Sequence, residues 1–220
     1  MNARTLSAVA IAALVATPLL IGRESVAPTQ RMTSTALDSA QVGTFLAGVR
    51  GASPMQCELS VHTVDQQFGW QRPGIMPDAA DAPHELMHRA LQRIDDPTTV
   101  PQLAGALRGP DPCARRIAAR LLGRSRLPAA VDALTDALGA SDENVRIVAA
   151  VGLGRAERRE TVGRLVGALA DPAPTVRAAV AWALGQIESR EAETALVRLL
   201  ETDPAAQVRR AAALAIGDLY

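Results

Sequence analysis

The stretch whose residue types and spacing could perform chemistry is His84-Glu85-Leu86-Met87-His88. Histidines four residues apart lie on the same face of a helix, one turn apart, where both can bind one zinc ion. The glutamate between them can act as a base that activates a zinc-bound water. This H-E-x-x-H pattern is typical of zinc peptidases, so proteolysis through His84, Glu85 and His88 is one candidate function.

The sequence around the motif argues against a peptidase. Arg89 directly follows the second histidine, where such peptidases usually carry a small or apolar residue. The H-x-x-G-x-x-H continuation is missing, and no glutamate follows Glu85 until Glu143. Asp95, Asp96 and Asp111 are left as poor substitutes for a third ligand. The repeat described below also accounts for this helix. We therefore favour a variant repeat helix without catalytic activity.

A structural zinc site is the intermediate alternative. The three histidines of the chain are His62, His84 and His88. His62 and His88 fall at equivalent places on helices of neighbouring repeats. They could bind one zinc ion if those helices pack directly. No cofactor is favoured by the sequence, and zinc stays an open alternative.

A repeat of about 31 residues organises the chain around this motif. Asp171–Ile187 shows its second helix: a turn at Asp-Pro, then Val-Arg, then an alanine-rich helix that closes on Leu-Gly. The arginines recur at Arg115, Arg146, Arg177 and Arg209, the glycines at Gly123, Gly154, Gly185 and Gly217, and the first helix recurs through Leu103, Leu134, Leu165 and Leu196. Self-similarity at a fixed period of this length predicts a stacked array.

The pattern within one repeat explains why the array must stack. One face of Asp171–Ile187 is apolar at helical spacing, from Val176 to Ile187. A single helix pair cannot enclose a core, so each pair must bury its flanks against its neighbours. We expect Leu165 and Leu196 to be buried. We also expect Gly185 and its equivalents to end or relax the second helix where the chain turns back.

The motif D-P-x-x-x-V-R-x-x-A-x-x-A-L-G, which Asp171–Gly185 follows closely, resembles the short HEAT-like repeat of phycobilisome lyases and many bacterial scaffold proteins. The resemblance covers Leu103 to Tyr220 and implies an all-α, right-handed α-solenoid of stacked antiparallel helix pairs. In such repeats the arginine after valine commonly pairs with an acidic loop residue of an adjacent repeat. The candidates here are Asp111, Asp142, Asp171 and Asp203. Tetrapyrrole binding, as in a bilin lyase, is a further alternative that rests on fold analogy alone.

The N-terminal residues predict export. Residues 1–22 begin with Arg4 and continue as an uncharged apolar run from Leu6 to Ile21. This pattern is typical of a secretory signal peptide or of an uncleaved N-terminal anchor, which would be the chain's one contact with a membrane. Residues 23–37 are polar and predict a linker. We expect a protein of the periplasm or cell envelope.

Residues 38–97 predict degenerate repeats, ahead of the regular repeats at 98–220. Gln41–Pro54 echoes Thr99–Pro112 and predicts a first helix. Met55–Gln66 is its partner, with Cys57, Val61 and Val64 facing inward. Residues 67–82 contain glycine, tryptophan and prolines and predict an irregular loop.

The two cysteines, Cys57 and Cys113, raise the question of a disulfide in an exported protein. The register places the helix Pro83–Ile94 between their two helices. Adjacent helices pack about 8–10 Å apart, whereas a disulfide needs Cα atoms within about 7 Å. We therefore expect no bridge, unless the irregular loop folds the N-terminal end back.

Composition restricts the partner class. The 23 basic and 23 acidic residues balance, and aromatic residues make up 2% of the chain. A neutral chain lacks the basic surface that nucleic acid requires, and few aromatic rings are available for stacking on bases. We therefore expect a non-catalytic scaffold that binds a protein or peptide, and no nucleic acid.

The second helices are predicted to line the concave, binding side of the solenoid. Stepping by the period from Ala178 and Trp182 marks two exposed rows of residues. An apolar patch rimmed by arginine is typical of a binding site. The predicted patch consists of Ile147, Val151, Trp182 and Leu214, flanked by Arg116, Arg120 and Arg210. The alternative is that these side chains only seal neighbouring helices.

Overall fold

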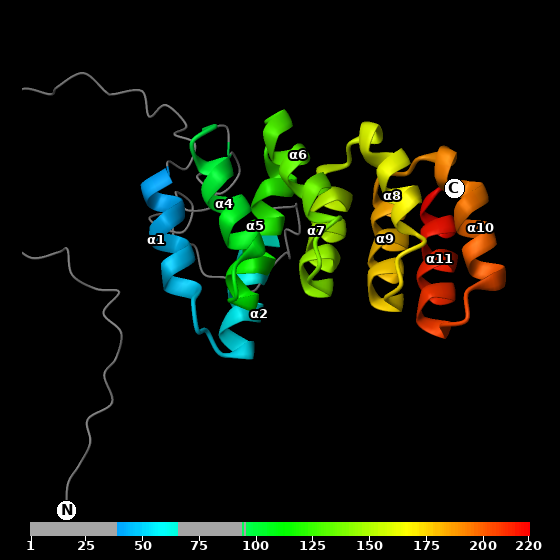
Figure 1. Cartoon of the computed structure of the whole chain (residues 1–220), viewed down its shortest axis with the longest axis horizontal. Helices are drawn as coiled ribbons and strands as arrows, with labels where there is room; N and C mark the ends of the chain where they lie inside the picture. The colour runs from blue at the N-terminus through cyan, green and yellow to red at the C-terminus, as the bar shows by residue number, and fades with distance from the viewer. Residues whose placement is uncertain (1–38, 66–93, 95) are drawn as a thin grey trace, which may run out of the picture. The chain divides into compact units, whose positions relative to one another are not determined.

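The computed structural model describes residues 39–65, 94 and 96–220, which belong to one compact unit, Thr33–Tyr220. These described residues form helices and no strands. The helices, labelled as in Figure 1, are α1 (Ser39–Val49), α2 (Pro54–Asp65), α4 (Thr99–Arg108), α5 (Pro112–Arg124), α6 (Pro128–Ala137), α7 (Glu143–Ala156), α8 (Val162–Ala168), α9 (Pro174–Gln186), α10 (Glu193–Thr202) and α11 (Ala206–Asp218). The 3-10 turns η1 (Arg159–Thr161) and η2 (Arg190–Ala192) lead into α8 and α10.

The helices stack as antiparallel pairs, which confirms the predicted all-α solenoid (Figure 1). Each first helix packs on its own second helix: α4 on α5, α6 on α7, α8 on α9 and α10 on α11. The second helices also pack extensively on one another, α5 on α7, α7 on α9 and α9 on α11. The first helices contact one another much less. The second helices therefore form the closely packed side of the array, as expected of the inner side of a solenoid.

The predicted core residues are buried. Leu165 and Leu196, at equivalent positions of α8 and α10, are both fully buried. On α9 the apolar face predicted from the sequence is buried from Val176 to Leu184, and Ile187 is buried just beyond the helix. Leucines of the first helices and leucines, alanines and valines of the second helices thus make one continuous core.

Gly154 and Gly185 do not end the second helices as left-handed caps, so that part of the prediction is wrong. Gly154 and Gly185 lie inside the last turns of α7 and α9. A Cβ atom on Gly154 would lie 2.8 Å from the Cα of Ala183, because α9 approaches it almost backbone to backbone. The left-handed residues that follow these helices are Glu157 and Glu188, with φ of 50° and 51°. The glycines are there to allow close helix packing.

The repeated arginines pair with the aspartates of the next repeat, as the family resemblance implies. Arg146 donates from Nε and Nη2 to both carboxylate oxygens of Asp171, at 2.7 and 3.1 Å. Arg177 does the same to Asp203, at 2.7 and 3.0 Å. Arg115 lies 3.4 Å from Asp142. Bidentate pairs of this kind fix orientation as well as adding energy, so they tie each repeat to the next.

The same arginines also hold their own turns. The Nη1 of Arg177 donates to the carbonyl oxygens of Asp171 and Pro172, at 2.9 and 3.2 Å. The hydrogen bond from Arg177 lowers the pKa of Asp203, although burial opposes this shift. Burial alone would raise the pKa of Asp171, but hydrogen bonds from Arg146 and from the backbone of Ala173 outweigh it and lower the pKa.

The N-terminal helix pair forms as predicted. In α2 the side chains of Cys57, Val61 and Val64 are buried. The loop after α1 is fastened by Asp111, which accepts from the backbone N–H of Gly51 at 2.8 Å and also caps α5 through the N–H of Ala114. Among the described residues Asp111 forms these backbone hydrogen bonds rather than a pair with a repeat arginine.

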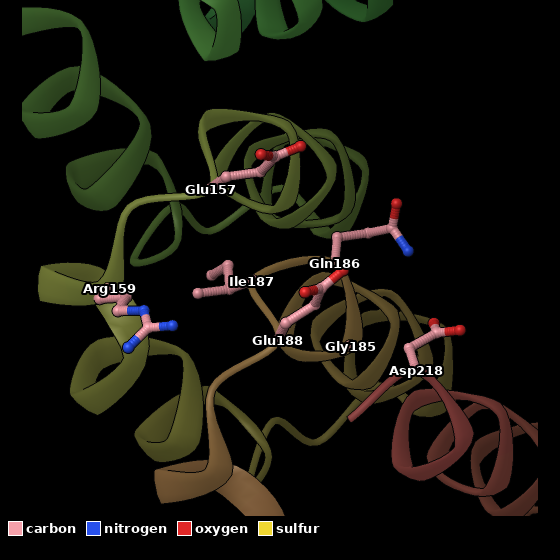
Figure 2. Close-up of a pocket in the computed structure, with 7 residues that line it drawn as sticks. All are labelled: Glu157, Arg159, Gly185, Gln186, Ile187, Glu188 and Asp218. Carbon is pink, nitrogen blue, oxygen red and sulfur yellow. The ribbon is translucent and has the colours of Figure 1, made fainter. Parts of the chain in front are cut away.

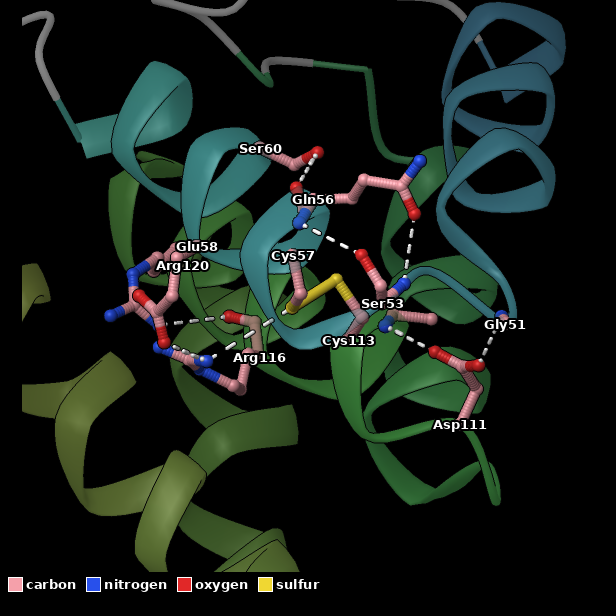
Figure 3. Close-up of a disulfide and its surroundings, with 11 residues drawn as sticks. Gly51, Ser53, Gln56, Cys57, Glu58, Ser60, Asp111, Cys113, Arg116 and Arg120 are labelled. Atoms are coloured by element: carbon pink, nitrogen blue, oxygen red, sulfur yellow. Dashed lines mark hydrogen bonds and ion pairs between the residues drawn. A yellow bond between two sulfur atoms is a disulfide. The ribbon is translucent and has the colours of Figure 1, made fainter.

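Cys57 and Cys113 form a disulfide, so the prediction of no bridge is wrong (Figure 3). Their Cα atoms lie 5.6 Å apart, because α2 packs directly on α5 while α1 packs on α4 and α5. The sequence register had counted one further second helix between them. The prediction assumed a separation of two helix steps between the cysteines, whereas α2 packs directly on α5.

Two further points concern membrane-spanning helices and the segments outside the described residues. Within the residues that the structure describes, no helix is both long and apolar enough to cross a membrane. The segments 1–22, 23–37 and 67–82, and the predicted helix Pro83–Ile94 except for Ile94, lie outside the described residues. The predictions made for them stay predictions.

Candidate functional site

The predicted patch is spread over four successive second helices. Arg116 and Arg120 lie on α5, Ile147 and Val151 on α7, Trp182 on α9, and Arg210 and Leu214 on α11. Val151 is half-buried, and Leu214 is 65% exposed. The stacking of α5, α7, α9 and α11 on one another brings these positions to one side of the array. We call this surface the second-helix face.

Two members of the patch also seal the joints between helices. Trp182 and Ile147 are half-buried and pack against the core. The indole of Trp182 lies over Gly154 on α7, where a Cβ atom would come within 2.9 Å of the ring. Trp182 therefore contributes to the α7–α9 joint and still presents part of its ring outward. The packing expected under the alternative interpretation is therefore observed, and the role of Trp182 in binding stays a prediction.

The arginines at the N-terminal end of the face contact the chain itself. Arg116 forms an ion pair with Glu58 of α2 at 2.7 Å, which lowers the pKa of that carboxyl. Arg120 donates to the carbonyl oxygen of Arg116 at 3.3 Å. Figure 3 shows both arginines beside Glu58 and the disulfide. At the other end of the face, Arg210 is exposed.

The sequence did not point to an acidic groove of about 410 Å³ at the C-terminal ends of α7, α9 and α11 (Figure 2). Its walls include Glu157, Glu188 and Asp218, with Arg159 as the basic lining residue. The signal was present, because Glu157 and Glu188 are one period of 31 residues apart. Nothing in the groove suggests chemistry beyond a local negative potential.

The predicted metal ligands cannot be placed. His84, Glu85 and His88 lie outside the described residues, and so does the side chain of His62. In the described part of the chain, no group of three or more histidine, cysteine or acidic side chains is gathered so that it could bind a metal ion.

Comparison with known proteins agrees with this geometry. A chain in the structure of the complex of CpcE and CpcF of phycocyanin lyase from Nostoc sp. PCC7120 is similar, with a TM-score of 0.54 at 20% identity, over 81% of this chain and 99% of that one. An engineered protein solved by a structural genomics consortium matches with a TM-score of 0.45 at 20% identity, over 82% of this chain and 79% of its own. Likeness at these identities concerns the fold. No curated protein sequence matches the chain.

The family model for HEAT repeats matches residues 78–150 and 134–217, and so covers most of the chain. The matched ranges include α4 to α10 and nearly all of α11. The family's repeat is the helix pair whose stacking, glycine contacts and arginine–aspartate pairs are described above. The chain therefore belongs to the family of HEAT-repeat proteins.

Proposed function

We propose that this protein is a non-catalytic scaffold that binds a protein or peptide on the second-helix face. The observation that carries the proposal is the run of apolar side chains at repeat-equivalent positions of α7, α9 and α11. Val151 and Trp182 are half-buried and Leu214 is exposed, so each presents apolar surface to water. Partly exposed apolar residues gathered on one surface are typical of interaction sites.

The proposal includes export of the protein, and the disulfide supports this part. Disulfides form and persist in oxidising compartments such as the periplasm and are rare in the reducing cytosol. The Cys57–Cys113 bridge is therefore consistent with the apolar N-terminal run and its interpretation as a signal peptide or anchor. The partner is then to be sought in the cell envelope.

Two other functions have less support. The peptidase alternative depends on a motif outside the described residues, and no feature of the described helices adds to it. Tetrapyrrole binding depends on a fold likeness to a chain from phycocyanin lyase, at an identity where function does not follow from fold. Zinc analysis of the purified protein and a tetrapyrrole titration test these alternatives directly.

The test of the scaffold is quantitative capture of a partner by the full chain and by two matched variants. Val151→Asp places a charge on the second-helix face, whereas Met55→Asp places the same charge on an exposed residue of α2. A partner recovered by the wild type and by Met55→Asp, and lost with Val151→Asp, supports the proposal. Equal recovery by all three proteins contradicts it, provided that circular dichroism shows intact folds.

A further inference from the structure

Each earlier second helix packs one of its faces against the next second helix of the array. On α11, the equivalent face is its outer side. On α9, Ala181 and Gly185 are buried, and Gly185 lies against Ala215 of α11. Their equivalents on α11, Ala213 and Gly217, are exposed. Among the described residues, no helix packs on this face of α11.

The glycine of this joint is open. A Cβ atom on Gly185 would lie 2.8 Å from the Cα of Ala215, and one on Gly154 would lie as close to the Cα of Ala183. A Cβ atom on Gly217 would meet no atom within 4 Å. Glycine is unfavourable in a helix compared with alanine. In α7 and α9 close packing offsets this disadvantage, and among the described contacts of α11 nothing does.

The arginine of this joint gives a second, independent observation. Arg209 donates from Nη1 to the carbonyl oxygens of Asp203 and Pro204, as Arg177 does in its own turn. Arg177 also directs Nε and Nη2 to the carboxylate of Asp203 in the next repeat. For Arg209, the part of the chain that the structure describes supplies no such carboxylate.

We propose that the outer face of α11 docks an α-helix of a partner protein. In the partner, a turn with an acidic residue precedes this helix, and the helix carries an alanine or glycine where it comes closest to α11. The carboxylate of the turn pairs with Nε and Nη2 of Arg209, and the small residue packs on Gly217. The interface continues the one that the array already makes three times, between α5, α7, α9 and α11.

A second copy of this chain fits the joint less well. The helix at the other end of the described array, α2, begins after Ser53 rather than after an aspartate. Its exposed side carries Met55 and Leu59, which are 76% and 62% exposed. Both are far larger than the alanines that approach Gly154 and Gly185. We therefore assign the face to a different protein.

The test uses a helix-stabilised, fluorescent peptide that copies residues 171–187, the segment that supplies Asp171 and Ala183 inside the array. Fluorescence anisotropy measures its binding to the full chain. A Cβ atom at position 217 meets no atom within 4 Å, so Gly217→Leu places its side chain in the open joint and should weaken binding by at least about tenfold. A peptide with Asp171→Asn should bind about tenfold more weakly to the wild type, and a peptide with Ala183→Leu should also bind more weakly.

The controls separate this face from the second-helix face and from self-association. Trp182→Ala should leave peptide binding unchanged, so this test can fail while the proposed scaffold function stands. Equal binding of the peptide to the wild type and to Gly217→Leu overturns the inference. So does the absence of binding at about millimolar peptide, which is the weak limit of specific association. A dimer of the chain alone that Gly217→Leu dissolves, seen by light scattering, also overturns it and gives the face to a second copy.

Discussion

The arginine–aspartate pairs are the residues that join the repeats electrostatically. In the Arg177–Asp203 pair the side chains are 13% and 4% exposed, so water screens the pair little. The folded state holds the carboxyl pKa below its ordinary value, and the bidentate arginine is the first cause. A depressed carboxyl pKa means that the pair stabilises the fold above the unfolded pKa, and that this stabilisation is lost as the pH falls through the folded value.

We therefore predict that Asp203→Asn destabilises the protein at neutral pH by about 1.5–3 kcal/mol, the usual contribution of a hydrogen bond to a charged group. The difference from the wild type should stay constant at neutral pH and shrink on acidification below about pH 4, the ordinary carboxyl range. Thermal unfolding between neutral pH and pH 2 measures both effects. A difference that persisted unchanged in acid would show that the charge of Asp203 is not what matters.

The glycines give a matched pair of substitutions at equivalent positions. Gly185→Ala places a methyl group against the backbone of α11 and should cost about 1–3 kcal/mol, the usual cost of overpacking. Gly217→Ala meets open space and should be neutral or stabilising by up to about 1 kcal/mol. Urea unfolding compares the two variants. Equal effects on stability would mean that close packing is not the reason for the glycine at 185.

These two residue types show how far sequence could lead at this scale. The arginine–aspartate pairing was predictable because the resemblance to HEAT-like repeats implies it and both partners recur with the period. The role of the glycines in close packing was not predictable from the sequence, because a glycine near a helix end also suits a left-handed cap. Only the approach of the next helix distinguishes the two roles. The actual left-handed residues, Glu157 and Glu188, gave no local signal.

At the scale of elements, the joint between α2 and α5 departs most from the sequence prediction. Periodicity placed the buried residues of α2 correctly, because helical spacing is local. It did not predict which helix α2 would pack against, since a residue count assumes that every segment adds one step to the stack. The direct α2–α5 contact, the Cys57–Cys113 bridge and the Arg116–Glu58 pair therefore had to come from the structure.

The disulfide should hold the α1–α2 pair onto the array. Replacing Cys57 and Cys113 by serine should cost about 2–4 kcal/mol, the typical loss for a removed bridge. Because repeats contact mainly their neighbours, the loss should appear first as faster hydrogen exchange in α1 and α2, while α9 to α11 stay protected. Reducing the wild type with a dithiol should reproduce the pattern. Uniform loss of protection in all helices would show that the array unfolds as one unit.

At the scale of the whole molecule, stability should add up from repeat to repeat. Leu165→Ala and Leu196→Ala each remove a fully buried side chain and should cost about 2–5 kcal/mol. The control Leu214→Ala changes an exposed side chain and should stay within about 0.5 kcal/mol. Thermal unfolding measures all three. If the buried substitutions left the melting temperature unchanged, the repeat register would be wrong.

The array also explains why the candidate site was only partly predictable. The period marked the positions that share the second-helix face, and the structure gathers them on successive helices. It could not reveal that Trp182 lies over Gly154 or that Arg116 is engaged by Glu58, because both contacts depend on side-chain packing between repeats. What stays open to a partner is mainly Val151, the outer part of Trp182, and the α11 end with Arg210 and Leu214.

The most direct test of the scaffold is site-specific photo-crosslinking in the native cells. A photoreactive side chain replaces Val151 on the second-helix face, and in a second protein it replaces Met55 on the exposed side of α2. We predict that one protein partner crosslinks from position 151 and not from position 55, and that Trp182→Ala in the same chain abolishes the crosslink. The same products from both positions, or a partner that crosslinks only from position 55, would contradict binding on the second-helix face.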